Sequence, residues 1–527
     1  MTLRWIVVFG ALFAGAASAA AGDKTDVVRD LAGRVGPIVG SALACRDIAR
    51  PRIQVIVDKF AAVISEAAST EAERSDLTQS LDRSVADGRT AVTTGRIDCR
   101  SADRQLADLE RSIAGPGPGA GPGPSPSLSA VIAPSSAAAA TAPTAPVASV
   151  APGPQIRGVT DREIRFGMAA PFSGPAKELG RQMKLGIDAA FNRVNEAGGV
   201  EGRSLKLFAA DDGYEPTRTP DAMKQLYDRD QVFGIIGNVG TPTAVVAVPF
   251  ALERRMLFFG AFTGANVLRH DPPDRYVFNY RASYAEETDA VVRYLVKIRR
   301  IPARQIAVFA QQDTYGDSGF AGVAKAMRAL GASDAAIVRL NYKRNTVDVE
   351  DAVNQLKSQK PAIKAVVMVA TYRAAAKFIE KTHDLFPGML YTNVSFVGST
   401  ALADELMLLG PRYAAGVIVT QVVPAVSGYS SVVLEYKNAL AKYFPGEAPD
   451  YVSLEGYVAA NVLIQGLKRS GQQIDTEKLI DVLENTRNFD LGLGAQLSFG
   501  RAEHQASHKI WGTAIDENGK YQAIELE

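Results

Sequence analysis

The sequence predicts an α/β protein with two doubly wound parallel-sheet lobes and a ligand cleft between them, preceded by a small all-α domain. From residue 156 onward, short apolar segments rich in branched side chains alternate with segments of helical periodicity, which is typical of parallel sheets covered by helices. The expected strands fall into roughly two sets that divide near Ser283. About 370 residues are too many for one such sheet. Residues 23–113, by contrast, show only helical periodicity.

The chain begins with features of a secretory signal peptide, which we assign to residues 1–21. Arg4 precedes the apolar run Trp5–Ala14, and small residues follow up to Ala19. The run is short for a membrane span, although a retained anchor is the alternative. No cysteine lies at the cleavage point, so a lipid-anchored form is not expected. We expect a soluble protein exported to the periplasm.

Residues 23–113 are predicted to form a small helical domain, with helices at 26–39, 53–67, 72–85 and 101–113. Cys45 and Cys99 are the two cysteines of the chain, and in an oxidising compartment they are most simply paired as a disulfide. The alternative is two unpaired buried thiols. Residues 114–155 are rich in proline, glycine and alanine, and we expect a semi-extended linker there.

The remainder, residues 156–527, is predicted to be the two-lobed domain. We expect lobe 1 to contain about 160–283 and about 422–490, and lobe 2 to contain about 284–421 and about 491–527. Strands are predicted at 163–169, 205–210, 232–236, 256–259, 277–282, 306–311, 335–340, 365–370, 394–398, 416–422, 496–499, 508–516 and 521–526. Helices are predicted at 180–196, 221–230, 243–255, 285–299, 320–330, 347–358, 374–385, 401–409, 432–443, 453–469 and 476–485.

The stretch from 231 to 265 contains two loops that each follow a strand, 237–240 and 260–265. Thr241 is expected at the N-cap and Pro242 at the first position of the helix that follows. The carboxyl edge of a parallel sheet is where ligands bind, and free N–H groups at a helix N-terminus suit a carboxylate. The alternative is two ordinary turns with capping threonines.

A polar or aromatic residue recurs just after a predicted strand, in both halves of the domain. Each one alone is an ordinary cap or surface residue, but the repetition predicts a shared cleft. The residues are Ser173, Thr241, Thr263, Tyr315, Tyr372 and Thr400.

Catalytic and metal sites are not expected. Residues 316–319 read Gly-Asp-Ser-Gly, as in trypsin-like proteases, but they lie between a strand and a helix, where Asp317 and Ser318 would cap the helix. His504 and His508 lie on a predicted strand at a spacing that does not favour a metal site. Asp211 and Asp212 could bind a cation but fit a turn cap better. We expect no cofactor, and the net charge of +1 gives no indication of nucleic-acid binding.

From about Gly158 to Glu527 the chain resembles the extracytoplasmic solute-binding proteins of the leucine/isoleucine/valine type, which serve ABC transporters. The resemblance is carried by 172–175, 194–203, 211–212, 237–241, 262–265, 315–316 and, more loosely, 453–460. It implies a type I periplasmic binding fold whose lobes close on a small solute, with a membrane ABC permease as partner.

The resemblance also implies roles for individual residues. Thr241 would bind the ligand carboxylate, and Ala261 and Thr263 would contact its carboxylate and ammonium groups. Tyr315 and Tyr372 would cover the ligand, and Leu179 would contact its side chain. The remaining residues expected at the ligand are Gly240, Phe262, Tyr284 and Thr400.

The family's ammonium-binding glutamate follows the strand that we predict at 394–398, and Ser399–Thr400 stand there in this chain. An unpaired buried ammonium is costly. Either Glu286 or another acid therefore replaces the glutamate, or the ligand is a carboxylate or amide-like solute without an ammonium. The leading hypothesis is a periplasmic ABC-transporter solute-binding protein. The alternatives are a ligand sensor reporting to a membrane receptor or kinase, with the helical domain as docking element, and an enzyme.

Overall fold

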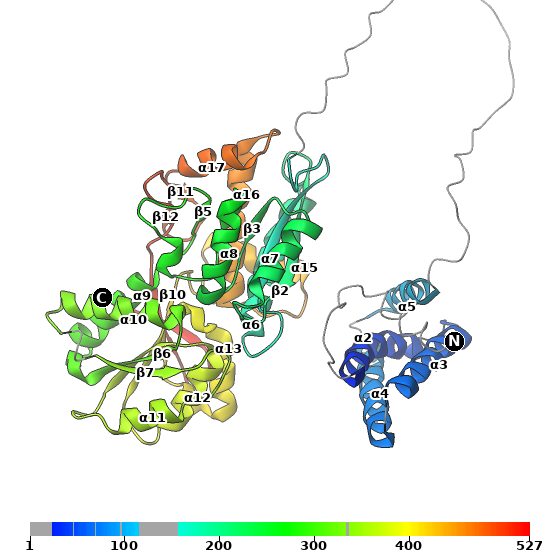
Figure 1. The fold of residues 1–527 in the computed structure, drawn as a ribbon, viewed down its shortest axis with the longest axis horizontal. Coiled ribbons are helices and arrows are strands. Elements are labelled where there is room, and N and C mark those ends of the chain that lie inside the picture. Colours follow the sequence, from blue (N-terminus) through cyan, green and yellow to red (C-terminus); the bar gives the residue numbers. More distant parts are fainter. Residues whose placement is uncertain are drawn as a thin grey trace, which may run out of the picture. The chain divides into compact units, whose positions relative to one another are not determined.

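The chain divides into two compact units, residues 1–145 and 146–527. The computed structural model describes residues 24–45, 47–68, 70–94, 97–114, 156–333 and 337–526 (Figure 1). The predicted signal peptide lies outside the described residues, as does the predicted linker apart from residue 114. Among the helices that the structure describes, none is long and apolar enough to cross a membrane.

The first unit is all-helical, and its helices are longer than predicted: α2 (Lys24–Ala44), α3 (Arg50–Ala67), α4 (Glu71–Thr93) and α5 (Cys99–Ala114). Side chains such as Val39, Phe60 and Leu106 form a separate apolar core. Cys45, just after α2, is bonded to Cys99 at the start of α5, with the two Cα atoms 5.6 Å apart. The disulfide therefore connects α2 and α5, the first and last of the helices described in this unit, across 54 residues of chain.

Helices α2 and α4 cross at backbone contact. A Cβ atom on Gly40 would lie 2.0 Å from the Val85 carbonyl oxygen, and one on Gly88 would lie 2.2 Å from the Pro37 carbonyl oxygen. Neighbouring Gly36 faces Ser84 in the same way. Small residues at these positions are required because a side chain would push the two helix backbones apart.

We expect Gly40→Ala to lower the free energy of unfolding of the helical unit by about 2 kcal/mol, because the added methyl group forces the α2–α4 crossing open. Gly33 lies on the same helix and is exposed, and a Cβ added to it would meet no atom within 4 Å. Gly33→Ala should therefore raise stability slightly, by up to about 1 kcal/mol, through helix propensity alone. Urea unfolding followed by circular dichroism measures both. Equal effects of the two variants would contradict the close crossing.

The second unit contains two sheets. The first has the order β2-β1-β3-β4-β5, and every pairing in it is parallel. Its strands are β1 (Glu163–Ala170), β2 (Ser204–Asp211), β3 (Gly234–Ile236), β4 (Leu257–Phe259) and β5 (Val277–Phe278). We call this sheet and the helices on it the first lobe. A doubly wound parallel sheet brings the ends of β1, β3 and β4 to one edge.

The second sheet, with the order β14-β13-β10-β9-β8-β6-β7, defines the second lobe. It is parallel from β10 to β7, and β13 and β14 add to its edge antiparallel. Its strands are β6 (Ile306–Gln311), β7 (Val338–Tyr342), β8 (Ala365–Val369), β9 (Leu390–Asn393), β10 (Ile418–Gln421), β13 (Trp511–Ile515) and β14 (Tyr521–Ile524). A small hairpin, β11 (Phe489–Asp490) and β12 (Gln496–Leu497), stands apart.

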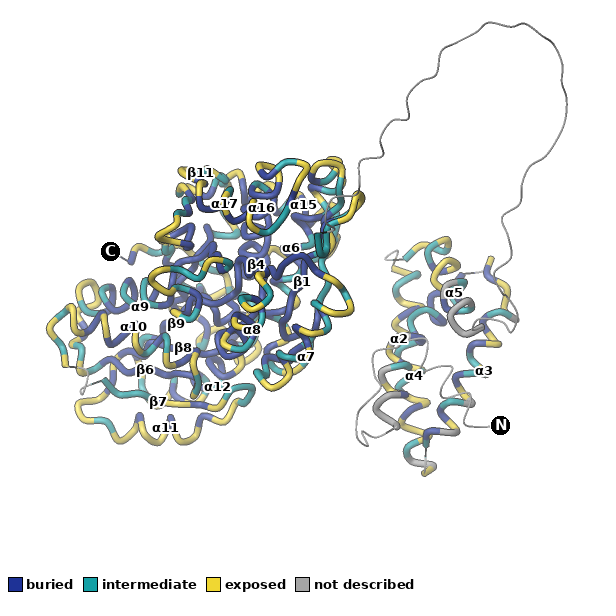
Figure 2. The backbone as a smooth tube through the Cα atoms, turned by 45° about the horizontal axis from the view of Figure 1, so that its top comes forward, coloured by how far each residue is buried: buried dark blue, intermediate teal, exposed yellow. Residues whose placement is uncertain are grey.

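Helices cover both sheets (Figures 1 and 2), with the buried residues concentrated on the strands and inner helix faces. The helices between β1 and β5 in the chain are α6 (Lys177–Glu196), α7 (Thr219–Lys224) and α8 (Thr241–Glu253). Those that follow β5 are α9 (Tyr284–Arg293), α10 (Thr314–Ala329), α11 (Glu350–Lys357), α12 (Tyr372–Thr382), α13 (Ser399–Leu409), α14 (Pro411–Ala414), α15 (Ser431–Tyr443), α16 (Tyr451–Ser470) and α17 (Thr476–Glu484). Helices α7 and α9 continue as π-helical turns at 225–229 and 294–298.

Segments far apart in sequence complete the first lobe. Helix α16 crosses α6 so closely that a Cβ on Gly186 would lie 1.8 Å from the Ser453 carbonyl oxygen. In Figure 1 these helices, coloured orange and teal, lie side by side. Phe499 packs on Phe259 and Phe278, so the chain returns to the second lobe near 505–508, later than the expected position near 491.

Three stretches of chain cross between the lobes and hydrogen-bond to one another. The Asn279 N–H donates to the His504 carbonyl oxygen at 2.7 Å, and the Ser507 N–H donates to the Tyr280 carbonyl oxygen at 3.0 Å. The Tyr280 hydroxyl donates to the Val422 carbonyl oxygen at 2.7 Å. These crossings are the only covalent connections between the lobes within the described residues, and they form the hinge for any lobe motion.

Candidate functional site

The loops after β3 and β4 meet as the sequence predicts. Val239 and Phe262 form a parallel bridge, and the Phe262 N–H donates to the Asn238 carbonyl oxygen at 2.7 Å. The pairing brings the hydroxyl oxygens of Thr241 and Thr263 to 2.7 Å from each other, with both side chains buried. Two hydroxyl groups are thus fixed side by side at the carboxyl edge of the first sheet.

The expected capping role of Thr241 is wrong. Helix α8 begins at Thr241, its N-cap is Gly240, and no side chain caps the helix. Gly240 has φ +106°, and a Cβ there would lie 2.2 Å from Cε2 of Tyr214. A glycine at the cap therefore leaves the Thr241 hydroxyl unused by its own helix and available to bond Thr263.

Ala261 is buried, but its side chain belongs to the core between the first sheet and helices α7 and α8. Only its backbone is placed to contribute to a ligand site. Leu179, in the first turn of α6, is buried against Gly398 of the second lobe, where an added Cβ would lie 2.6 Å from Cδ2 of Leu179. Leu179 thus forms part of the contact between the lobes.

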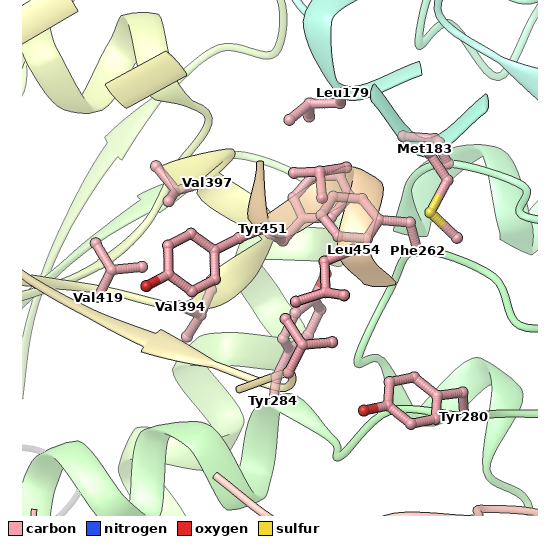
Figure 3. Packing of buried hydrophobic residues seen from close by; sticks show 14 of the residues in the cluster. Leu179, Met183, Phe262, Tyr280, Tyr284, Val394, Val397, Val419, Tyr451 and Leu454 are labelled. Carbon is pink, nitrogen blue, oxygen red and sulfur yellow. The ribbon is translucent and has the colours of Figure 1, made fainter. Parts of the chain in front are cut away.

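The second lobe contributes aromatic rings to the same place. Tyr284 begins α9 and Tyr315 lies in the first turn of α10, and their ring centroids are 5.3 Å apart. Both side chains are fully buried. Figure 3 shows apolar side chains of both lobes, among them Leu179, Phe262 and Val397, gathered into one cluster.

Phe396, which the sequence patterns did not single out, has its ring at the centre of this cluster. It lies 5.0 Å from the Phe262 ring of the first lobe and 4.7 Å from the Tyr315 ring of the second. The strand predicted at 394–398 is wrong, because β9 ends at Asn393 and residues 395–397 form a 3-10 turn. The residue directed at the cleft after β9 is therefore Phe396, two residues after Val394, and not Thr400.

Tyr372 and Thr400 lie in a different place. They line a cavity of about 210 Å³ at the edge of the lobe contact, together with Lys177, Arg181, Asp404 and Asp450. The Tyr372 hydroxyl donates to the Pro175 carbonyl oxygen of the first lobe at 2.5 Å. The structure therefore separates the expected residues into an inner cluster, containing Thr241, Phe262, Thr263, Tyr284 and Tyr315, and this outer cavity.

The Gly-Asp-Ser-Gly tetrapeptide is part of helix α10, which begins at Thr314, earlier than predicted. The expected capping by Asp317 and Ser318 is wrong, because the Asp313 carboxylate caps the helix by accepting from the Tyr315 N–H. The Ser318 hydroxyl donates to the Thr314 carbonyl oxygen, and Asp317 pairs with Arg339. These bonds give the tetrapeptide an ordinary helical role.

Glu286, the acid that could replace the family's glutamate, already has partners within the protein. It lies in the first turn of α9, where its carboxylate accepts from the Ser283 N–H and hydroxyl in a capping box. It also accepts from Gln505 and His508. Although burial opposes ionisation, hydrogen bonds from His508 and Ser283 lower the pKa of Glu286 to about 2.

The other acids and histidines named above have structural partners. The carboxylates of Asp211 and Asp212 accept from backbone N–H groups and hydroxyls of the adjacent turns, in agreement with the expected turn role. His504 stacks on Phe278, and His508 pairs with Glu286. Over the part of the chain that the structure describes, no group of three His, Cys, Asp or Glu side chains could hold a metal ion.

A buried ion network joins the lobes beside the aromatic cluster. The Arg281 guanidinium, 1% exposed, bonds the Glu287 carboxylate at 2.7 Å and lies 3.4 Å from the carboxylate of Glu455 on α16. Glu287 also accepts from the Ser395 N–H at 2.8 Å and the Thr420 hydroxyl at 2.5 Å. Because Arg281 lies on the hinge segment, Glu287 in the second lobe and Glu455 in the first, this network stabilises the lobes in contact.

Sequence patterns contain a signal for this network. Arg281 follows the apolar run that contains β5, and Glu455 lies in the otherwise apolar first half of α16. A lone charge within a buried apolar segment requires a partner, because burying an unpaired charge is costly. The sequence alone does not show that the partners come from opposite lobes.

Glu455 makes the stability of the two-lobed unit depend on pH. Burial, aided by nearby Glu287 and opposed by Arg281, raises the pKa of Glu455 from 4.5 to about 7. The folded state therefore binds a proton that the unfolded state has lost, so stability falls as pH rises from about 4.5 to about 7. We expect Glu455→Gln to reduce this fall by about 2–3 kcal/mol. Urea unfolding at several pH values measures it, and parallel curves for wild type and variant would contradict it.

A second set of polar contacts fastens the lobes opposite the hinge. Arg344, in the loop after β7, bonds Glu215 of the first lobe at 3.0 Å and Asp313 at 2.8 Å. Asn345 donates to the Glu215 carboxylate at 2.6 Å, and Gln311 donates to the Tyr214 hydroxyl at 3.1 Å. We call these contacts the latch. The hinge and the latch bracket the aromatic cluster, as expected of a clamp in its closed form.

Comparison with known proteins places this arrangement in a family. The family model described as periplasmic binding protein matches residues 163–520. A Leu/Ile/Val-binding protein homolog 3 of Brucella melitensis is 25% identical over 339 residues, covering 63% of this chain and 86% of the relative.

Solved structures agree with the family match. A crystal structure described as a possible leucine/isoleucine/valine-binding protein from Rhodopirellula baltica is 40% identical, with a TM-score of 0.66, covering 71% of this chain and 98% of that one. A branched-chain amino acid ABC transporter protein from Thermus thermophilus with bound valine shares the fold at 16% identity, with a TM-score of 0.60, covering 69% and 96%. The chain therefore belongs to the periplasmic binding protein family and has the fold of its leucine/isoleucine/valine-binding type.

Proposed function

We propose that the chain is the periplasmic solute-binding component of an ABC uptake system. It binds a small amino-acid-like or carboxylate solute between its lobes and presents the closed form to a membrane permease. The observation that carries the proposal is the convergence of the Thr241 and Thr263 hydroxyls from one lobe with Tyr284 of the other, whose ring packs on that of Tyr315. Relatives of the chain include Leu/Ile/Val-binding proteins, which supports a solute of this size.

A protein that binds a solute by closing two lobes needs no covalent reaction of that solute. A solute favours the closed form to the extent that it contacts both lobes, and the three segments of the hinge permit the motion. The hydroxyl pair and the first N–H groups of α8 suit one carboxylate group, which a helix N-terminus also favours electrostatically. The latch would then act as a polar contact that forms only on closure.

One observation favours a second candidate, a ligand sensor that reports to a membrane receptor. The helical unit has its own core and disulfide. A separate folded unit of this kind is suited to docking on a partner. Deletion of residues 23–113 should leave solute binding unchanged in either case. Loss of uptake would indicate a role in transport, and loss of a transcriptional response would indicate a sensor.

The hydroxyl pair provides the direct test. A panel of L-amino acids, each paired with its deaminated carboxylate, identifies solutes that raise the thermal stability of the mature protein. We expect Thr241→Val and Thr263→Val each to weaken binding of the best solute by about ten- to hundredfold, because each removes a hydrogen bond to a charged group. Isothermal titration calorimetry measures the affinity.

Thr382→Val is the matched control. Thr382 is equally buried, but its hydroxyl bonds the Phe378 carbonyl oxygen and the Tyr391 hydroxyl within the second lobe, away from the cluster. We expect this variant to lose stability without losing affinity. Unchanged affinity in both Thr241 and Thr263 variants would contradict the proposed site.

A further inference from the structure

We propose that the solute is an aromatic carboxylate without an ammonium group, and that its ring competes with the Phe396 ring for one set of aromatic contacts. The inference rests on the proposed function, because it names the class of solute for the same cleft. Three observations support it, namely the rings around Phe396, the hydroxyl groups beside them and the partners that the nearby acids already have within the protein.

The first observation is the ring environment of Phe396. Its ring centroid lies 4.7 Å from Tyr315, 5.0 Å from Phe262, 5.9 Å from Tyr214 and 6.4 Å from Tyr284. These are the separations at which tilted and edge-to-face ring pairs are favourable. The rings of Tyr214 and Phe262 belong to the first lobe, and those of Tyr284 and Tyr315 belong to the second. A planar ring in the place of Phe396 would therefore contact both lobes, as a closure-inducing solute must.

The second observation is the set of hydroxyl groups in this aromatic environment. The Tyr315 hydroxyl is fully buried and has no hydrogen-bond partner among the described residues. A buried hydroxyl is normally paired. The Thr241 and Thr263 hydroxyls bond each other, and both could donate to the two oxygens of one carboxylate instead. Together they supply the polar contacts that an aromatic acid requires.

The third observation concerns the acids beside the cluster. The Glu287 carboxylate accepts from Arg281, the Ser395 hydroxyl, the Ser395 N–H and the Thr420 hydroxyl. Two hydrogen bonds on each oxygen leave it no capacity for an ammonium group. Glu286 accepts from the Ser283 N–H, the Ser283 hydroxyl and Gln505 on one oxygen and from His508 on the other. Glu455, the third acid here, lies 3.4 Å from the Arg281 guanidinium. Each of these described acids therefore already has a partner in the protein, and an α-ammonium at the cluster would have to displace one of those partners.

The turn that carries Phe396 is suited to such competition. Residues 395–397 form a 3-10 turn that ends at Gly398, whose φ of +80° lies in the left-handed region. The preceding residue, Ser395, is anchored by Glu287 and Arg281. The hydrogen bonds to Ser395 hold one end of the turn in place, whereas Gly398 allows the backbone at the other end to change conformation. The Phe396 ring can therefore be displaced without breaking the ion network.

The test uses the full mature protein and calorimetric titration with six solutes. They are 3-phenylpropanoate, phenylacetate, benzoate, L-phenylalanine, 4-methylpentanoate and L-leucine. We expect at least one aromatic acid to bind, with L-phenylalanine and L-leucine at least tenfold weaker. Phe396→Ala should tighten the binding of that aromatic acid several-fold by removing the competing ring. Phe396→Leu, which keeps an apolar side chain, serves if the alanine variant does not fold.

Phe386→Ala is the control, since Phe386 is a partly buried residue of the second lobe beyond the end of α12. It should not change the affinity. Tighter binding of an amino acid than of its deaminated counterpart overturns the inference and leaves the proposed function in place. Binding of 4-methylpentanoate alone has the same consequence. If no solute of this set or of the full amino-acid panel binds to wild type or to either Phe396 variant, the proposed function fails as well.

Discussion

Replacing Arg281 by methionine is expected to destabilise the two-lobed unit by about 3–5 kcal/mol, because it leaves a buried carboxylate without its cation. Arg281 is 1% exposed and contacts Glu287 and Glu455, which are also buried. Methionine keeps the length and apolar character of the side chain, so the loss reports the charge rather than a cavity. The measurement is urea unfolding at pH 8, where carboxyl groups in water are ionised.

The control for this variant removes the charge that is left behind. Arg281→Met combined with Glu287→Gln should recover much of the loss, because a neutral amide in place of the carboxylate no longer requires the guanidinium. Arg293→Met, at a partly exposed position of α9, should cost less than about 1 kcal/mol. An additive loss in the double variant would contradict a coupled network.

Removing the disulfide by Cys45→Ser and Cys99→Ser is expected to cost the helical unit about 4 kcal/mol, because the bond closes a loop of 54 residues in the unfolded chain. The unit has only a small core, so this loss is a large part of its stability. We expect its thermal transition to fall by tens of degrees or to disappear, measured by calorimetry on the full chain.

The two-lobed unit provides the internal control for the disulfide variant, because it contains no cysteine. Its transition and its solute affinity should stay unchanged. Wild-type protein treated with a reductant should behave like the double variant. A helical unit of undiminished stability after reduction would show that the bond is formed but not needed.

The fold class followed from the sequence because its signals are local. Alternation of apolar runs with helical periodicity predicted the two parallel sheets, and β6 agrees with the predicted strand at 306–311 residue for residue. The place of Thr241 and Thr263 also followed, since residues after neighbouring parallel strands must meet at one edge. The errors at helix starts, such as Asp313 rather than Asp317 capping α10, have a local cause. Asp313 and Asp317 are both suitable capping residues within one turn of each other, and the helix begins after the earlier one.

Tertiary structure alone decided what lies opposite the threonines. The sequence did not reveal that Phe396 would face Phe262, because β9 ends earlier than the apolar pattern suggests and one residue of displacement changes which side chain points into the cleft. It also did not reveal that Arg281 and Glu455, 174 residues apart, would pair across the lobes. Local patterns determine which segments are strands and helices, whereas the partners of a buried charge or ring depend on how distant segments pack.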